Sequence, residues 1–242
     1  VLTGIEISEY RDPLTGAGLN ELLRQIEGCE TPERIRLISI DPLYVDDEFI
    51  NIISESKKIA KSLHIPLQSG SDRILAFMNR HYSQTYIRNM LGNLNKKIPD
   101  IGIGIDVIVG FPAEDEEDFE KTYNLLDTIG IYYLHVFPFS ARPGTVAASM
   151  NKKVPEHIIK ERVRRLKNLD AQKREAFYTR FVGTERQMIV EGKLYKNLYM
   201  RGYTENYIPV YIPYDKLLEN RVVKVKITGV KDGMVMGKKA EG

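Results

Sequence analysis

Residues 103–111 read Ile-Gly-Ile-Asp-Val-Ile-Val-Gly-Phe, and Pro-Ala-Glu-Asp-Glu-Glu-Asp follows at residues 112–118. The first run is apolar and rich in β-branched residues, which predicts a strand buried on both faces. The acidic run suits the first turn of a helix, where the backbone dipole favours negative charge. A buried strand that leads directly into a helix is the repeating unit of a parallel α/β sheet.

The same alternation continues on both sides of this stretch. The pattern predicts five parallel strands, at residues 1–6, 34–40, 64–68, 103–111 and 132–139. Apolar spacing of the helical kind predicts five helices, at residues 19–26, 46–58, 71–79, 84–97 and 114–129. The chain opens on Val-Leu-Thr-Gly-Ile with no turn or cap before it, so we expect it to start inside a strand, with earlier sequence missing.

The pattern changes after residue 144. Residues 155–181 carry one apolar stripe and predict a long helix that begins at a proline. Beyond Gly183 the hydrophobic period becomes two, and five short strands are predicted, at residues 186–191, 197–203, 208–212, 222–227 and 234–236. Such strands are typical of a small antiparallel β-barrel. We therefore expect two domains, residues 1–181 and 182–242.

Composition narrows the class of protein. The chain is 43% hydrophobic and 28% charged, which is typical of a globular protein. No run reaches the roughly 18 apolar residues of a membrane span, and no signal peptide is visible, so we expect a cytoplasmic protein that binds no membrane. The single cysteine, Cys29, cannot form an internal disulfide or hold a metal cluster alone. His64 and His135 have no partner at metal-ligand spacing, so we expect them to pack and predict no metal site.

The net charge of +2 hides an uneven distribution. Residues 1–154 hold 16 Lys and Arg against 22 Asp and Glu, a net charge of −6. Residues 155–242 hold 19 against 11, a net charge of +8. A polyanion would bind at the basic end, although long basic side chains can also simply solvate a helix.

Polar residues and glycines where predicted strands end are the first candidates for a site, because ligands of parallel α/β folds bind at the carboxyl edge of the sheet. Gln68 follows an apolar strand and has no capping role, whereas Ser69 can equally cap the next helix. Asp106 interrupts an apolar strand and should have a specific partner, because a buried carboxylate is costly unless it is bonded. Gly110 permits close approach of a flat ligand, although a tight turn explains it as well.

The last strand runs into Ser140, Arg142 and Thr145. An arginine between serine and Gly-Thr suits an anion or a phosphate, and a surface ion pair is the alternative. No Walker-type phosphate loop and no nucleophile elbow is present in the sequence.

Five blocks in order resemble the methylthiotransferase family of radical S-adenosylmethionine (SAM) enzymes. They are Ser-Ile-Asp-Pro at 39–42, His-Ile-Pro-Leu-Gln-Ser-Gly-Ser at 64–71, Asp-Val-Ile-Val-Gly-Phe-Pro at 106–112, His-Val-Phe-Pro-Phe-Ser-Ala-Arg-Pro-Gly-Thr at 135–145 and Gly-Tyr-Thr-Glu-Asn-Tyr at 202–207. The resemblance covers essentially the whole chain. The fourth and fifth blocks most resemble the branch that acts on threonylcarbamoyladenosine beside the anticodon of tRNA.

The resemblance implies a partial barrel of six βα units without its first strand, followed by a TRAM-like RNA-binding barrel. It implies that the residues around SAM are Gln68, Ser69, Asp106, Ile108, Gly110, Phe137 and Pro138. It implies that the residues towards RNA are Ser140, Arg142, Arg201, Tyr203 and Asn206, with Tyr199 and Tyr207 as further stacking candidates.

The reaction implied is replacement of an aromatic C–H by a methylthio group, with SAM and two 4Fe-4S clusters as cofactors and tRNA as partner. The family's two cysteine sets are absent from this chain, and Cys29 matches neither. We therefore expect that this chain holds no cluster and does not cleave SAM alone, and that it is a monomer. The alternatives are the branches for isopentenyladenosine in tRNA or for a ribosomal protein, and a non-catalytic RNA-binding protein.

Overall fold

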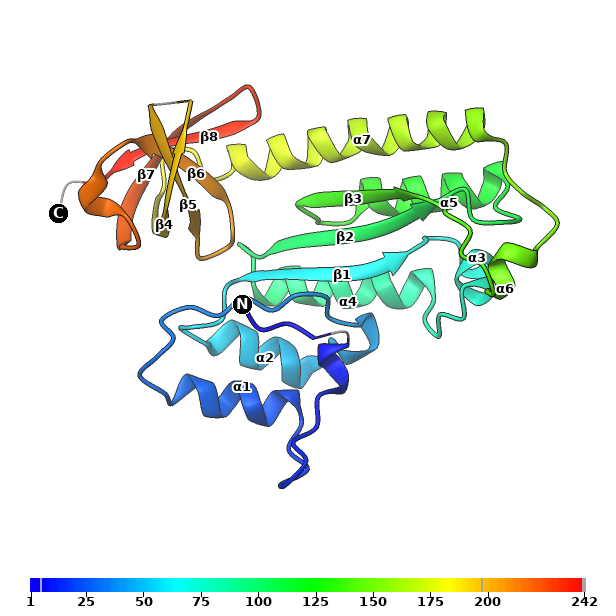
Figure 1. The fold of residues 1–242 in the computed structure, drawn as a ribbon, viewed down its shortest axis with the longest axis horizontal. Coiled ribbons are helices and arrows are strands. Elements are labelled where there is room, and N and C mark those ends of the chain that lie inside the picture. Colours follow the sequence, from blue (N-terminus) through cyan, green and yellow to red (C-terminus); the bar gives the residue numbers. More distant parts are fainter. Residues whose placement is uncertain (5, 197, 241–242) are drawn as a thin grey trace.

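The computed structural model describes residues 1–4, 6–196 and 198–240. A parallel sheet of three strands forms its centre, in the order β1 (Ser62–Gln68), β2 (Gly102–Val109) and β3 (Tyr133–Pro138) (Figure 1). Side chains at alternate positions of β2, such as Ile103 and Ile105, are fully buried against the helices. The predicted α/β class, with buried parallel strands, is confirmed.

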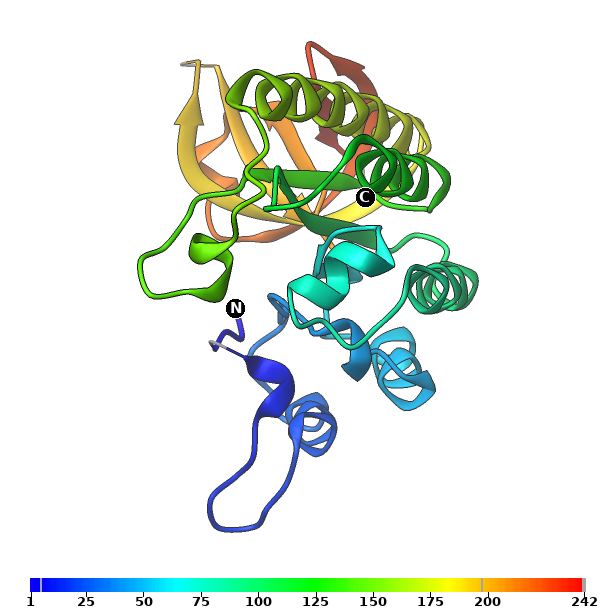
Figure 2. The same ribbon diagram turned by 90° about the vertical axis from the view of Figure 1, so that its right-hand side faces the viewer.

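The helices between the strands cover one side of the sheet, and the other side stays open towards the loop that carries α6 (Figure 2). Most of them begin where the sequence provides a cap: Ser71, Ser83 and Asp115 each accept a bond from a backbone N–H of the first turn. The helices of this part are α1 (Leu19–Glu27), α2 (Asp47–Glu55), α3 (Asp72–Phe77), α4 (Gln84–Lys97), α5 (Glu116–Thr128) and α6 (Val146–Ser149), with 3-10 turns at Ile7–Glu9 and Pro42–Tyr44.

The first two predicted strands, at residues 1–6 and 34–40, are not regular strands. Among the described residues they make isolated parallel bridges, Leu2 with Leu37 and Ile35 with Ile59. Backbone bonds still hold the two segments beside the sheet, as from the Ile40 N–H to the His64 carbonyl at 2.9 Å. A positive φ of 55° at Ser39 breaks the extended conformation that a continuous ladder needs.

Helix α7 (Glu156–Thr179) lies along β3, as Figure 1 shows, and begins one residue after the predicted proline. Leu166 and Leu169 of its apolar stripe are fully buried. The Leu134 N–H donates to Asp170 of the helix at 2.7 Å. The helix therefore packs against β3 and connects the parallel sheet to the second part of the fold.

The second part is a closed five-stranded barrel with the strand order β4-β5-β6-β8-β7. Its core of buried residues includes Met188, Val210 and Ile227, and it continues into Tyr132, just before β3, and Phe177 of α7. All five predicted strands are found, but β6 and β8 pair parallel, so the barrel is not wholly antiparallel. The strands are β4 (Glu185–Tyr195), β5 (Tyr199–Thr204), β6 (Pro209–Pro213), β7 (Val222–Lys231) and β8 (Met234–Lys239), with a 3-10 turn at Lys216–Leu218.

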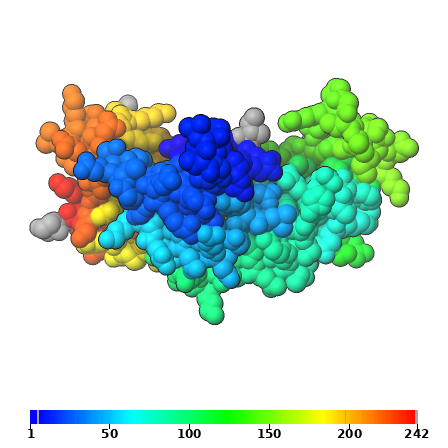
Figure 3. Space-filling model, turned by 90° about the horizontal axis from the view of Figure 1, so that it is seen from below, coloured from blue at the N-terminus to red at the C-terminus, as the bar shows by residue number. Residues whose placement is uncertain are grey.

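Seen from below, residues 1–60 lie between this barrel and the far end of the sheet (Figure 3). Within the described residues, no helix is both long enough and apolar enough to cross a membrane.

Candidate functional site

A cavity opens where the three parallel strands end. Its volume is about 510 Å³, which is within the range of small-molecule sites. The lining residues come from the C-terminal halves of β1, β2 and β3, from the loop before α6 and from α6 itself: Gln68, Asp106, Ile108, Phe137, Pro138, Phe139, Ser140, Arg142, Thr145 and Ala147. Eight residues singled out in the sequence therefore meet in one place, although they are spread from position 68 to position 145.

The cavity combines polar groups with an aromatic surface. Phe137 lines the cavity and is 49% exposed, so its ring is accessible to a ligand there. Gln68 adopts a left-handed backbone with φ of 70°, a conformation that costs free energy in a residue other than glycine. Such strain is typical of functional sites, where the surrounding structure holds a side chain in a required direction.

Ser69 and Gly110 do not line the cavity. Ser69 is fully buried, and its hydroxyl lies 3.2 Å from the Thr122 hydroxyl of α5. Gly110 has φ of 79°, and a Cβ there would stand 2.5 Å from Ile159 of α7. In the described structure both residues therefore pack against helices, Ser69 against α5 and Gly110 against α7. Their predicted contact with SAM finds no support in this placement.

A buried ion pair that the sequence did not reveal fixes the loop after β2. Arg162 of α7 lies 2.8 Å from Glu114, and their side chains are 4% and 1% exposed. Glu114 also accepts a bond from the Gly110 N–H at 2.7 Å. Burial raises the pKa of Glu114, while the Gly110 N–H and Arg162 act in the opposite direction. The pair lies 48 residues apart in the chain, and no local pattern connects the two.

The expected partner of Asp106 is a pair of histidines on the inner face of the sheet. Asp106 Oδ1 lies 2.7 Å from His64 Nε2 on β1 and 3.3 Å from His135 Nδ1 on β3. His64 Nδ1 lies 3.0 Å from the Tyr133 hydroxyl. The sequence offers no metal-ligand spacing around either histidine, yet parallel register brings Asp106 and His135 side by side, and His64 lies close to both.

The residues assigned to RNA in the C-terminal barrel divide into two kinds. Asn206 is fully buried and donates to the Asp100 carbonyl at 3.0 Å, so this placement gives no support to its predicted RNA contact. Tyr203 stacks on Tyr207 at 4.3 Å between ring centroids, and Arg36 lies 3.6 Å over the Tyr207 ring. Residues 203–207 thus fasten the barrel to the first part of the chain.

Arg201 remains on the surface side of the barrel. Its guanidinium is bonded to Glu191 at 2.7 and 2.9 Å and lies 4.9 Å from the ring centroids of both Tyr195 and Tyr203. Proteins that bind single-stranded nucleic acids use aromatic rings for base stacking and arginines for cation–π contacts.

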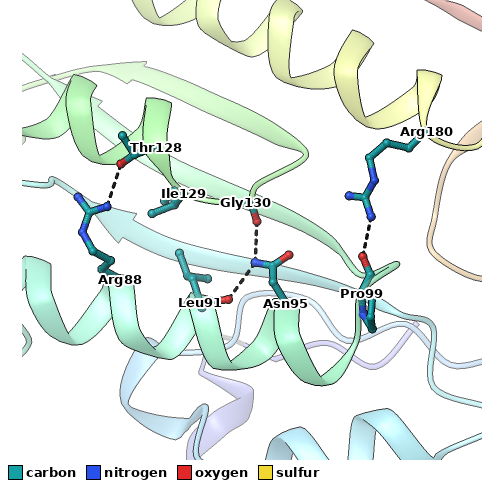
Figure 4. Close-up of a pocket in the computed structure, with 9 residues that line it drawn as sticks. Arg88, Leu91, Asn95, Pro99, Thr128, Ile129, Gly130 and Arg180 are labelled. Atoms are coloured by element: carbon teal, nitrogen blue, oxygen red, sulfur yellow. Dashed lines mark hydrogen bonds between the residues drawn. The ribbon is translucent and has the colours of Figure 1, made fainter.

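Another cavity, of about 450 Å³, lies between α4 and the end of α7, away from the carboxyl edge of the sheet (Figure 4). Its two arginines already have neutral acceptors: Arg88 donates to Thr128 at 2.9 Å and Arg180 to the Pro99 carbonyl at 2.8 Å. These bonds tie neighbouring elements together. The cavity at the strand ends is therefore the better candidate for a site.

Comparison with known proteins agrees with this geometry. The radical SAM superfamily model matches residues 7–126, which contain β1, β2 and the helices around them. Curated relatives match most of the chain, among them a threonylcarbamoyladenosine tRNA methylthiotransferase of Aquifex aeolicus, 43% identical over 87% of this chain and 50% of the relative. The chain belongs to the radical SAM methylthiotransferase family.

Other family members give the same picture. The threonylcarbamoyladenosine tRNA methylthiotransferase of Bacillus subtilis is 37% identical over 94% of this chain and 51% of its own length. The tRNA-2-methylthio-N(6)-dimethylallyladenosine synthase of Wolinella succinogenes is 34% identical over 98% of this chain and 56% of its own. The chain thus spans about half the length of the curated relatives that it matches.

Among solved structures, coproporphyrinogen III oxidase of Escherichia coli, a radical SAM enzyme, shares the fold. Its TM-score is 0.51 at 19% sequence identity, over 64% of this chain and 36% of that one.

The two cofactors of the family fit this chain differently. The cavity at the strand ends offers polar side chains beside an exposed aromatic ring, which suits a nucleoside such as that of SAM. An iron–sulfur cluster needs three or four thiolates, and the sequence contains one cysteine, the exposed Cys29. The residues of this chain therefore fit SAM and do not fit a cluster.

Proposed function

We propose that this chain is the SAM-binding and RNA-facing part of a tRNA methylthiotransferase that acts on threonylcarbamoyladenosine. The single observation that carries the proposal is the gathering of Gln68, Asp106, Phe137 and Arg142 around one cavity at the carboxyl edge of a radical SAM fold. The relatives in Aquifex aeolicus and Bacillus subtilis are both threonylcarbamoyladenosine tRNA methylthiotransferases, which supports the choice of nucleoside.

In this proposal, the chain's own residues position SAM. Gln68 and Asp106 donate and accept bonds at the ribose or methionine portion, and Phe137 with Pro138 covers the adenine. SAM supplies the adenosyl radical and the methyl group when it is bound. The thiolates that hold the clusters come from sequence outside these 242 residues. Ser140 and Arg142, in the loop before α6, line the same cavity and are proposed to contact the RNA.

The C-terminal barrel is proposed to be the TRAM-like RNA-binding module, and residues 182–242 to be its extent. The net charge of +8 on residues 155–242 supports a polyanionic partner. Arg201, between two tyrosine rings, is the strongest contact candidate on this barrel. A cytoplasmic location belongs to the same proposal, because tRNA modification requires access to the tRNA pool. A monomeric state is proposed with it.

SAM binding to the chain is tested by saturation-transfer NMR with SAM and S-adenosylhomocysteine. The expected result is transfer to the adenine and ribose protons, reduced at least threefold in Phe137→Ala and Gln68→Ala. Gln25→Ala is the matched control, because Gln25 is an exposed residue of α1, away from the cavity. Equal transfer in all four proteins would exclude the cavity as the site.

The substrate is tested in the organism by deleting the gene and analysing tRNA nucleosides by mass spectrometry. Loss of the methylthio form of threonylcarbamoyladenosine supports the proposal. Loss of the methylthio form of dimethylallyladenosine instead supports the second branch, which the 34% identity to the Wolinella succinogenes synthase favours. No change in either nucleoside would contradict both.

A further inference from the structure

Two imidazoles and one carboxylate meet on the inner face of the parallel sheet. His64 comes from β1, Asp106 from β2 and His135 from β3, so each strand contributes one side chain. One nitrogen or oxygen from each residue lies within 4.8 Å of the other two. The side chains are 8%, 20% and 50% exposed in the same order. The cluster is therefore buried at His64 and accessible to solvent at His135.

Hydrogen bonds within the cluster do not satisfy its carboxylate. Asp106 Oδ1 is buried and has no partner of acceptable hydrogen-bond geometry, although both imidazoles lie close to it. The ring nitrogens of His64 and His135 thus do not direct an N–H along the line to this oxygen. A buried carboxylate oxygen without a bonded donor is costly, which indicates that something else completes the group.

Three donor atoms of these types suit a divalent transition-metal ion. Zinc and iron bind histidine nitrogen and carboxylate oxygen at about 2.0–2.2 Å, which separates neighbouring ligand atoms by about 3.0–3.5 Å. The distances of 2.7 and 3.3 Å within the cluster are close to that separation. Two histidines and one carboxylate leave further coordination positions open, as in catalytic sites.

The surroundings of His64 support the same chemistry. The Tyr133 hydroxyl, at 3.0 Å from Nδ1, can accept the proton of that nitrogen and leave Nε2 free to bind an ion. Gly104 makes this contact possible, because a Cβ at that position would stand 2.1 Å from the Tyr133 ring. Metal-binding histidines are commonly oriented by such a second hydrogen bond.

We propose that His64, Asp106 and His135 bind one divalent first-row transition-metal ion of the zinc or ferrous type. The site differs from the iron–sulfur clusters of the proposed function, since it contains no cysteine. Asp106 also lines the cavity at the strand ends, and a carboxylate has two oxygens, so binding of the ion through Oδ1 leaves Oδ2 for a ligand in that cavity.

The test is a titration of the untagged chain with Co²⁺ in a Cys29→Ser background, which removes the exposed thiol as a competing ligand. After chelation and dialysis, the expected result is saturable binding of one ion per chain, with visible absorption bands that Zn²⁺ abolishes. His135→Ala and Asp106→Asn should each weaken the affinity at least tenfold. Tyr133→Phe should weaken it about tenfold through His64.

His81→Ala and His157→Ala are the matched controls, because these two histidines lie outside the cluster. Both should bind Co²⁺ with unchanged affinity. Circular dichroism and the metal-free thermal midpoint establish that each variant is folded. The proposal is overturned if no saturable binding occurs, or if His135→Ala binds as tightly as the parent while a control variant loses the ion.

Discussion

Asn206 is predicted to hold the C-terminal barrel against the parallel sheet, and Asn206→Ala tests this. The side chain is fully buried, donates to the Asp100 carbonyl at 3.0 Å and accepts from the Thr204 hydroxyl at 2.6 Å. Each lost bond is worth about 1 kcal/mol, and the buried carbonyl left unpaired adds to the cost. We expect the variant to lose about 2–3 kcal/mol of unfolding free energy.

Urea denaturation followed by circular dichroism measures this loss. With a slope of about 3 kcal/mol per M, the midpoint should fall by about 0.7–1 M. Gly102→Ala tests the same contact from the sheet, because a Cβ there would stand 2.7 Å from the Asn206 carbonyl oxygen. Its midpoint should fall as well.

Two matched variants serve as controls. Asn124→Ala removes an exposed asparagine of α5, and Gly92→Ala adds a methyl group in α4 where nothing lies within 4 Å. Neither should lower the midpoint, and Gly92→Ala should raise it slightly through helix propensity. If Asn206→Ala unfolds at the same urea concentration as Asn124→Ala, the contact between barrel and sheet does not contribute to stability and our interpretation of residues 203–207 is wrong.

Three further predictions concern the sheet edge and the basic end. Burial acts to raise the pKa of Asp118, but bonds from Arg73, Ser71 and the Asp115 N–H outweigh it and hold that pKa below its usual value. The stability that these bonds give is present above the pKa of Asp118 in the unfolded chain, near 4, and is lost as pH falls through the lower pKa of the folded state. Arg73→Ala should therefore lower the free energy of unfolding by about 1–3 kcal/mol at pH 7. In urea titrations below about pH 4 this loss should become progressively smaller. Gly110→Ala should lower the free energy of unfolding by about 2 kcal/mol, because φ at this residue is 79° and the new Cβ would stand 2.5 Å from Ile159. Adding Ile159→Ala should restore only the part of this loss that comes from the steric clash. Full restoration by the double variant would show that the backbone is not strained. Arg201→Ala should weaken binding of an anticodon stem-loop and reduce the salt dependence of log K by about one charge in fluorescence titrations, whereas an unchanged slope would place Arg201 outside the RNA surface.

Local sequence determined the helices well and the strand pairing less well. Ser83 and Asp115 cap the next helix through their own side chains, so α4 and α5 begin within two residues of the prediction. Strand pairing depends on neighbours that are distant in sequence. Residues 34–40 have the composition of a strand. They nevertheless form only isolated bridges, Leu37 with Leu2 and Ile35 with Ile59, and Ser39 has a left-handed backbone that interrupts the extended conformation.

The candidate site shows the same division. Gln68 and Arg142 could be found because polar residues at or after the ends of apolar strands meet at one edge of a parallel sheet, and Asp106 because it interrupts an apolar strand. The partners of Asp106 could not be found, because His64 and His135 reach it only through strand register. Asn206 was assigned to RNA because the family resemblance implies an RNA-binding barrel, whereas its side chain bonds to Asp100, more than a hundred residues away.

The most direct test of the central claim is the nucleoside content of tRNA from a deletion strain that carries the full-length gene with single changes around the cavity. The parent gene should restore the methylthio form of threonylcarbamoyladenosine, Asp106→Ala and Arg142→Ala should fail to do so at equal protein levels, and Gln25→Ala should restore it fully. Full restoration by Asp106→Ala and Arg142→Ala would contradict the claim that the carboxyl edge of this sheet is where the reaction takes place.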